Sequence, residues 1–204
     1  SNVTLEPLYQ LAKQQNLEFI PDTYLMQGDD DKAYKFLEEI NYYKCSDDTY
    51  NCLSEDNLYH VGDYFYHIMQ YEKALAINKI IFELFENGSI SSLENISAAY
   101  YRCGMIYMKW GQFEKSIEYF TNALNISIAN QSDDYFWHVT YYRRLGLVHY
   151  YMDDYQKASN YYLEAFELSD NVDDNTAMKS ICSYGYISEL LGESDIANSM
   201  MSQC

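Results

Sequence analysis

A glycine recurs at a nearly fixed interval along this chain, and it strongly limits what the chain can fold into. The steps are 42, 42 and 39 residues between Gly62, Gly104, Gly146 and Gly185. A second small residue keeps almost the same step, at Ala74, Ser116, Ala158 and Ala197. A fixed step with a fixed internal pattern is the sequence signature of a repeat protein, in which each unit stacks on the next.

Apolar residues around each glycine recur at helical spacing, which predicts that every repeat is a pair of helices. Residues 141–168 show the pattern most clearly, as two helices joined by a tight turn at Asp153-Asp154, which we expect to cap the second helix. A small residue in each helix would let the two backbones approach closely. The chain has only 2 Pro and 8 Gly, which also favours helices. We therefore predict an all-α fold of antiparallel helix pairs.

The repeats also predict how the whole chain is organised. Four helix pairs are expected over residues 49–204, and residues 1–48 are expected to form N-terminal helices, a degenerate first repeat or cap, continuous with them in a single domain. Within that segment, an amphipathic helix over Leu5–Ile20 would end at Pro21. The carboxylates Asp29–Asp31 would stabilise the N-terminus of the next helix.

These features resemble the tetratricopeptide repeat family. The resemblance covers about residues 49–204, and residues 5–43 more faintly, and it rests on motifs such as Leu58-x-x-Val61-Gly62-x-x-Phe65 and Tyr142-x-x-Leu145-Gly146-x-x-His149. The common repeat of the family has about 34 residues, so the step found here implies longer helices and longer links. Such long repeats are similar to two subsets of the family: cytoplasmic peptide-pheromone receptors of Gram-positive bacteria, and adaptor scaffolds that bind regulatory segments.

The resemblance implies a right-handed superhelical solenoid whose first helices line a concave groove. It also implies a non-enzymatic scaffold that binds a peptide or a partner protein in that groove. The alternative is a sensory, peptide-binding domain of a larger transcriptional regulator or signalling protein. No group of residues has catalytic spacing, so we expect no catalytic residue, and we expect neither a metal nor another cofactor.

In such a stack, the residues three before each glycine, and one and four after it, would point into the groove. They form an aromatic and methionine-rich set, which suits peptide binding because Tyr is a rigid anchor and Met adapts its shape. The alternative is that some of them pack against neighbouring helices. Together with three arginines, the candidate groove residues are Tyr59, Tyr66, Tyr101, Arg102, Met105, Met108, Arg143, Arg144, Leu147, Tyr150 and Tyr186.

The arginines stand out because the chain is so acidic. Arg102 and Arg144 hold the same repeat position on successive first helices, so they could converge on one anion. A guanidinium fork suits a carboxylate or a phosphate. The alternative is that the arginines form ion pairs with Asp133, Asp134 or Glu118.

The charge balance limits the partner. With 13 basic and 31 acidic residues, the net charge is −18, which repels nucleic acid and anionic membranes. We therefore expect no direct nucleic acid contact, and the partner would be basic or neutral unless the charge serves solubility alone. His149 replaces an aromatic residue of the repeat pattern, so it is expected to be a packed ring and not a catalytic base.

The cysteines and the chain ends give the last expectations. Five cysteines, odd in number and without a CxxC motif, indicate a reduced cytoplasmic protein, with Cys103 in the core and a Cys45–Cys52 disulfide as the one pairing considered. No apolar run reaches the roughly 18 residues of a membrane helix. The chain starts without Met, so a native segment could precede it. The last helix lacks a polar cap, which predicts further residues or a homodimer through the uncapped end.

Overall fold

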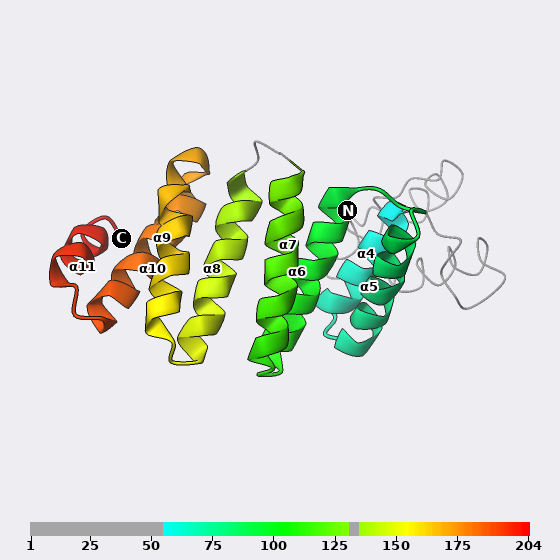
Figure 1. Ribbon diagram of the computed structural model, residues 1–204, viewed down its shortest axis with the longest axis horizontal. Helices are drawn as coiled ribbons and strands as arrows, with labels where there is room; N and C mark the ends of the chain where they lie inside the picture. Colours follow the sequence, from blue (N-terminus) through cyan, green and yellow to red (C-terminus); the bar gives the residue numbers. More distant parts are fainter. Residues whose placement is uncertain (1–54, 131–134) are drawn as a thin grey trace, which may run out of the picture. The chain divides into compact units, whose positions relative to one another are not determined.

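The computed structural model describes residues 55–130 and 135–204. Over these ranges the chain forms eight α-helices, labelled α4 to α11 in Figure 1, and one short 3-10 helix, and it forms no strand. The prediction of an all-α fold is therefore confirmed. The N-terminal helices expected over residues 1–48 and the cysteines considered for a disulfide, Cys45 and Cys52, lie outside the described residues.

The helices follow one another in pairs, as the repeat pattern predicts. The pairs are α4 (Glu55–His67) with α5 (Tyr71–Glu86), α6 (Leu93–Lys109) with α7 (Phe113–Ala129), α8 (Tyr135–Tyr151) with α9 (Tyr155–Glu167), and α10 (Asp174–Leu190) with α11 (Ser194–Met201); the 3-10 helix Ser169–Asn171 follows α9. The structure divides into two compact units between Asn95 and Ile96. The expectation of one continuous domain stays a prediction.

The first unit contains the pair α4 and α5. The core side of α4 is formed by Leu58, Val61, Tyr64 and Phe65, which are all at most 6% exposed. The core side of α5 is formed by Ala74, Ile77 and Ile81, which are at most 2% exposed. Ala74, the small residue of this repeat, is fully buried, as the packing argument requires.

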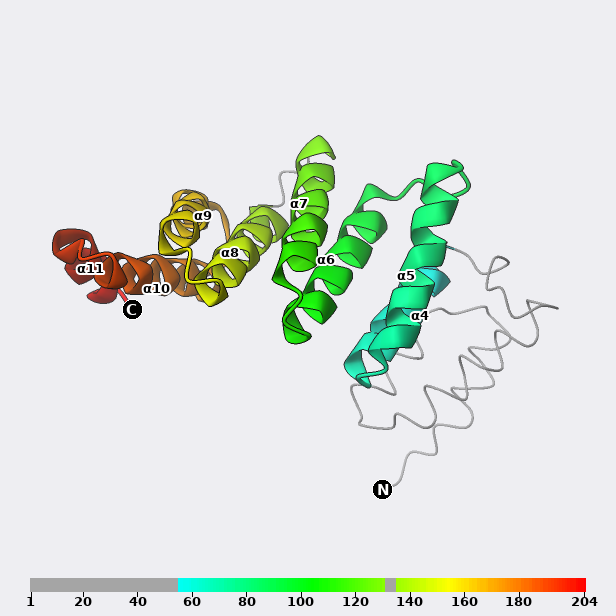
Figure 2. The same cartoon turned by 60° about the horizontal axis from the view of Figure 1, so that its bottom comes forward.

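The second unit runs from Ile96 to Cys204, and its helices follow one another in chain order. Figure 2 shows α8 next to α9, and α10 between this pair and α11. Its core is largely formed by aromatic and aliphatic side chains from facing helices, with Phe120 of α7 and Tyr141, Leu145 and Val148 of α8 in one cluster. Two linked hydrogen bonds cross this cluster. The Ser97 hydroxyl donates its proton to the Ala123 carbonyl at 3.0 Å, and its oxygen therefore accepts from the Tyr141 hydroxyl at 2.8 Å.

Close approach at the repeat glycines explains why that position recurs. The ring of Phe120 covers Gly104, where an added Cβ would lie 2.6 Å from the ring. The Ser116 hydroxyl also donates to the Gly104 carbonyl at 2.8 Å, which ties the two small positions of this repeat together. A side chain at Gly104 would therefore separate α6 from α7.

The turn between the two helices has the same backbone geometry in all four pairs. The seventh residue after the repeat glycine has a positive φ in all four pairs, at Met69 (61°), Gly111 (70°), Asp153 (58°) and Gly192 (79°). In each case the next residue donates its N–H to a carbonyl in the last turn of the first helix, as Asp154 does to His149 at 3.0 Å. This is the Schellman arrangement that ends many helices.

Candidate functional site

The first helices α6 and α8 meet through two of the predicted groove residues. The Arg144 Nε donates a hydrogen bond of 3.3 Å to the Tyr101 hydroxyl. The guanidinium carbon of Arg144 also lies 6.0 Å from the centroid of the Tyr101 ring, at the outer limit of a cation–π contact. The structure therefore brings together Tyr101 of one repeat and Arg144 of the next.

Tyr101 also packs into the core, as the alternative interpretation of the aromatic stripe predicts. Its ring centroid lies 5.7 Å from that of Phe120, 5.6 Å from that of Tyr141 and 6.1 Å from that of Trp137. Met105 and Met108 are half-buried against the same cluster. These three residues stabilise the helix pairs, and each is left only partly accessible.

The positive charge of Arg143 has no ion-pair partner in the part of the chain that the structure describes. Its Nε atom is buried and has no hydrogen bond, and neither Arg143 nor Arg144 forms an ion pair with any residue of the described ranges. Burial lowers the pKa of Arg143, and the positive charge of Arg144 lowers it further. Among the predicted partners, Glu118 makes no such pair, and Asp133 and Asp134 lie outside the described residues.

Arg102 occupies a different environment from Arg144. Its side chain is 3% exposed, whereas Arg144 is half-buried and bonded to Tyr101. Arg144 lies next to Arg143 in the chain, and the repulsion between the two charges lowers the pKa of Arg143. We therefore base the candidate anion site on Arg143 and Arg144.

A second contact joins the first helices α8 and α10. The Tyr150 and Tyr186 hydroxyl oxygens lie 3.4 Å apart, and their ring centroids lie 5.9 Å apart with the rings edge to face. Tyr155 packs on Tyr150 at 5.8 Å and donates its hydroxyl proton to Asp153 at 2.8 Å. Tyr186 is 46% exposed, so the outer side of this contact is open to solvent.

These contacts define one surface, which we call the first-helix face. On α8, residues 143, 147 and 150 are spaced by four and three positions and so lie on one side of the helix. Tyr101 adjoins this side from α6 and Tyr186 from α10. The face consists of Tyr101, Arg143, Arg144, Leu147, Tyr150 and Tyr186.

The predicted residues of the first repeat lie in the other unit. Tyr59 and Tyr66 belong to α4 and are half-buried. The Tyr66 ring lies 5.9 Å from that of Tyr71 at the start of α5. Their place in a binding surface stays a prediction.

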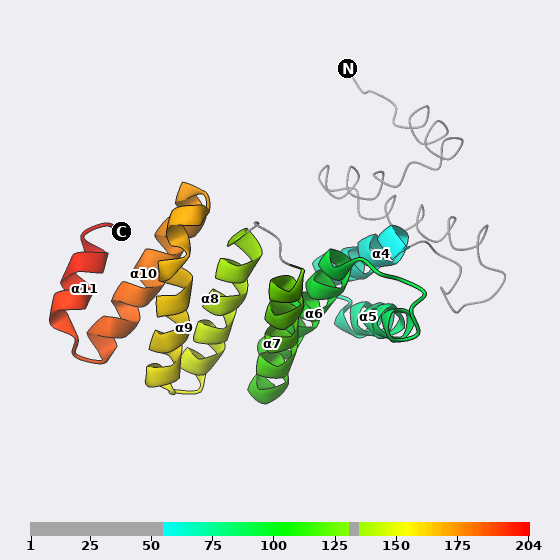
Figure 3. The same cartoon turned by 45° about the horizontal axis from the view of Figure 1, so that its top comes forward.

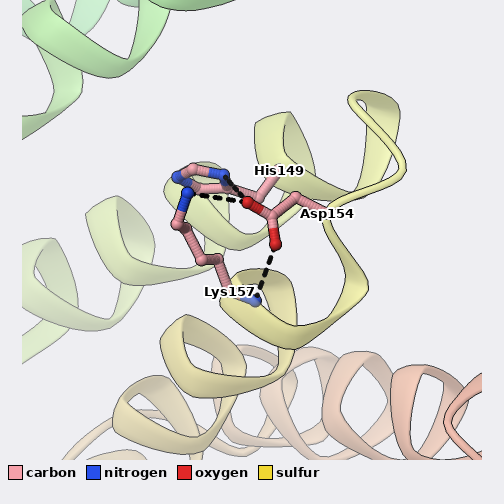
Figure 4. Close-up of polar contacts among 3 residues, drawn as sticks. All are labelled: His149, Asp154 and Lys157. Carbon is pink, nitrogen blue, oxygen red and sulfur yellow. Dashed lines mark hydrogen bonds and ion pairs between the residues drawn. The ribbon is translucent and has the colours of Figure 1, made fainter.

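His149 is a packed ring, as expected from its place in the repeat. It is 6% exposed and stacks on Tyr161 with centroids 5.4 Å apart. Figure 4 shows its Nδ1 facing Asp154, 3.8 Å from the Oδ2 atom that also pairs with Lys157 Nζ at 2.8 Å. Asp154 accepts from the Lys157 backbone N–H as well, so the prediction that this turn caps the second helix is confirmed.

A disulfide joins Cys182 of α10 to Cys204, with Cα atoms 5.5 Å apart. The expectation of fully reduced cysteines is therefore wrong for this pair. Sequence reasoning missed it because the two residues are 22 positions apart and lie in no cysteine motif. Cys103 is not disulfide-bonded and is 1% exposed, which confirms its expected place in the core.

Metal-binding clusters and membrane-spanning helices are both absent from residues 55–130 and 135–204. No group of three or more His, Cys, Asp or Glu side chains there could hold a metal ion. Over the same ranges, no helix has the length and apolar character needed to cross a membrane.

The fold and the paired first-helix contacts define a helical-repeat protein built from stacked antiparallel helix pairs. Residues 95–171 match the family model described as tetratricopeptide repeat. The resemblance predicted from the sequence is therefore confirmed over these residues, whereas the assignment to a long-repeat subset of the family stays a prediction. No curated protein sequence shows a significant match to the chain.

Solved structures with the same fold cover most of the chain. BtubC (BKLC) from P. vanneervenii is 14% identical with a TM-score of 0.78, covering 98% of this chain and 85% of its own. The apo form of RapI is 13% identical with a TM-score of 0.76, and the match covers 91% of this chain and 66% of RapI. A Podosopora anserina putative kinesin light chain with TPR-like repeats is 12% identical with a TM-score of 0.71. The match covers 94% of this chain and 93% of the kinesin light chain structure. At these identities the likeness defines the fold alone.

Proposed function

We propose that this chain is a protein-interaction scaffold that binds a peptide, or a segment of a partner protein, on the first-helix face. Solenoids of stacked helix pairs present extended surfaces of this kind to their partners. Rigid tyrosines offer large apolar area at a small cost in conformational entropy. Tyr101, Tyr150 and Tyr186 supply such anchors here, and Leu147 adds an aliphatic contact.

The observation that carries the proposal is that Arg143 and Arg144 form no ion pair with residues 55–130 or 135–204. A partly buried guanidinium without an anion costs folding free energy, because the protein replaces its water only in part. A carboxylate or phosphate of the partner would supply the missing charge and fix the orientation of the bound segment. The overall charge of −18 weakens long-range attraction of an acidic partner, so recognition would depend on close contact.

The test uses the full chain and an array of peptides in which an acidic residue is flanked by Leu, Tyr or Phe. The same peptides with Gln in place of the acidic residue form the matched set. Binders from the array are then measured by fluorescence anisotropy against wild type, Arg143→Glu and Tyr150→Ala. Each substitution should weaken binding by about tenfold, because each removes one anchor worth about 1–2 kcal/mol.

Two control variants lie on a second helix. Lys115→Glu changes the charge by the same amount on α7, and Tyr119→Ala removes an aromatic ring from the same helix. Neither should change the affinity. Equal loss in Lys115→Glu, unchanged affinity in both face variants, or an array without any binder would contradict the proposal. A sensory domain of a larger transcriptional regulator would use the same face, so these variants test that version as well.

A further inference from the structure

The Cys182–Cys204 disulfide lies at a repeat position that belongs to the first-helix face. Cys182 stands three residues before Gly185, as Tyr101 does before Gly104 and Arg143 before Gly146. Its disulfide partner is Cys204, which follows α11, and in Figure 3 the end of the chain lies beside α10. The covalent bond therefore attaches the segment 202–204 to the helix that supplies Tyr186.

The attached segment lies next to the tyrosine contact described above. Cys182 and Tyr186 are four residues apart on α10, so they are neighbours on one side of that helix. Tyr186 in turn contacts Tyr150 of α8. The disulfide thus holds residues 202–204 beside the α10 end of the face.

α11 packs closely on α10, and the disulfide adds a covalent link to that packing. It has eight residues, of which Ala197 is the one buried side chain, and Ile196 and Met201 are exposed. It approaches α10 closely at Gly185, where an added Cβ would lie 2.9 Å from Met200 Cβ, and Met200 packs against the cluster that contains Tyr184 and Ile187. A helix this short is unstable without tertiary contacts, so the docking of α11 depends on these contacts together with the covalent link.

Neither cysteine of the disulfide is buried. Cys204 is exposed and Cys182 is half-buried, whereas Cys103 is 1% exposed. Access of a thiolate to one sulfur atom is a requirement for thiol–disulfide exchange. The described residues therefore contain one reducible pair. Cys103 is an internal comparison, because the same reagent should reach it slowly.

We propose that Cys182–Cys204 is a thiol–disulfide exchange site that controls how far the first-helix face extends along α10. A dithiol attacks one sulfur to form a mixed disulfide, and its second thiol then closes a cyclic disulfide. The dithiol loses two electrons and two protons, and Cys182 and Cys204 become thiols. In the reduced chain, residues 202–204 leave α10, α11 detaches from α10 more often, and the surface around Cys182 and Tyr186 opens to the partner. The effect on binding rests on the proposed function, whereas the exchange and the opening do not.

The first experiment measures the opening without a ligand. Peptide mapping of the oxidised full chain should contain a fragment that links Cys182 to Cys204, and dithiothreitol should remove it. Hydrogen exchange over residues 194–201 should then accelerate by about thirtyfold to a thousandfold, as expected on losing a link of this loop length. Cys204→Ser should show the fast exchange without reductant and no response to it. Absence of the linked fragment, or equal exchange in both states, overturns the inference.

The second experiment measures binding of the acidic array peptide to the oxidised chain, the reduced chain and Cys204→Ser. We expect the latter two to bind several-fold more tightly. If all three proteins bind the peptide equally while α11 opens on reduction, the disulfide does not control binding on the first-helix face. The proposed scaffold function is unaffected by that result. If no form binds any array peptide, the proposed function fails and the control of binding fails with it, while the exchange site stands on the hydrogen-exchange result.

Discussion

The Tyr162 ring on α9 lies directly over Gly146 on α8, so that a Cβ at position 146 would stand 2.7 Å from Tyr162 Cε1. Tyr162 is 6% exposed and has little room to move away. We therefore expect Gly146→Ala to lower the free energy of unfolding by about 1–3 kcal/mol, even though alanine is the better helix former. Urea denaturation of the two proteins measures the difference.

The control for this prediction is the same substitution with a smaller neighbour. Tyr162→Leu removes the ring atoms that a Cβ would meet, so Gly146→Ala should cost much less in that background. An equal cost in both backgrounds would mean that the glycine is needed for its backbone and not for the close approach.

A second prediction concerns the turn between α4 and α5. Met69 has a φ of 61°, and its side chain is 72% exposed, so a strained backbone is not offset by packing. Met69→Gly should raise the free energy of unfolding by about 0.5–1 kcal/mol, the relief of left-handed strain less the extra chain entropy of glycine. Thermal denaturation followed by circular dichroism measures the change.

The matched variant is Gly111→Ala, at the equivalent turn between α6 and α7. Gly111 has a φ of 70°, and an added Cβ would meet no atom within 4 Å. Gly111→Ala should therefore lower the free energy of unfolding by about 1 kcal/mol through backbone strain alone. If Met69→Gly destabilises the chain while Gly111→Ala has no effect, the shared turn geometry does not determine stability.

Much of the fold could be predicted from the sequence because it is determined by local periodicity. The recurrence of Gly104 and Gly146 predicts a close contact in each pair, and the structure shows which rings cover them. The cap at Asp154 follows from an aspartate placed before a helix. These features need only spacing and residue type.

The candidate site could be predicted only in part because its contacts join different repeats. Spacing places Tyr101 and Arg144 on first helices, but the hydrogen bond between them depends on how α6 packs on α8. Spacing also gives Arg102 and Arg144 equivalent positions, yet Arg102 is 3% exposed and Arg144 is half-buried. The disulfide depends on the path of residues 202–204, for which the sequence contains no repeat signal.

A third prediction concerns pH. Burial lowers the pKa of His149, while the Asp154 carboxylate raises it in part and Lys157 lowers it again. The unfolded chain therefore binds this proton more tightly than the folded chain, and the free energy of unfolding should fall as the pH drops below the ordinary histidine pKa of about 6.5. Above that pH the contribution of His149 is constant.

The measurement is urea denaturation at several pH values from about 7 to about 5. Because other groups titrate in this range, the comparison is with His149→Phe, which keeps a ring on Tyr161 and cannot bind the proton. The stability of wild type should fall more steeply than that of the variant. Parallel curves would show that His149 has the same pKa in both states.

The last prediction separates a binding role of Arg143 from a structural one. Arg143→Met keeps an unbranched side chain while removing a partly buried charge and its repulsion of Arg144. Since the guanidinium has no ion pair among the described residues, the free energy of unfolding should stay the same or rise, whereas affinity for the acidic peptide should fall about tenfold. Arg143→Lys should keep part of that affinity through its charge. A loss of stability of about 1 kcal/mol or more in Arg143→Met would instead make this arginine a structural residue, because the folded chain would then need its guanidinium without any partner.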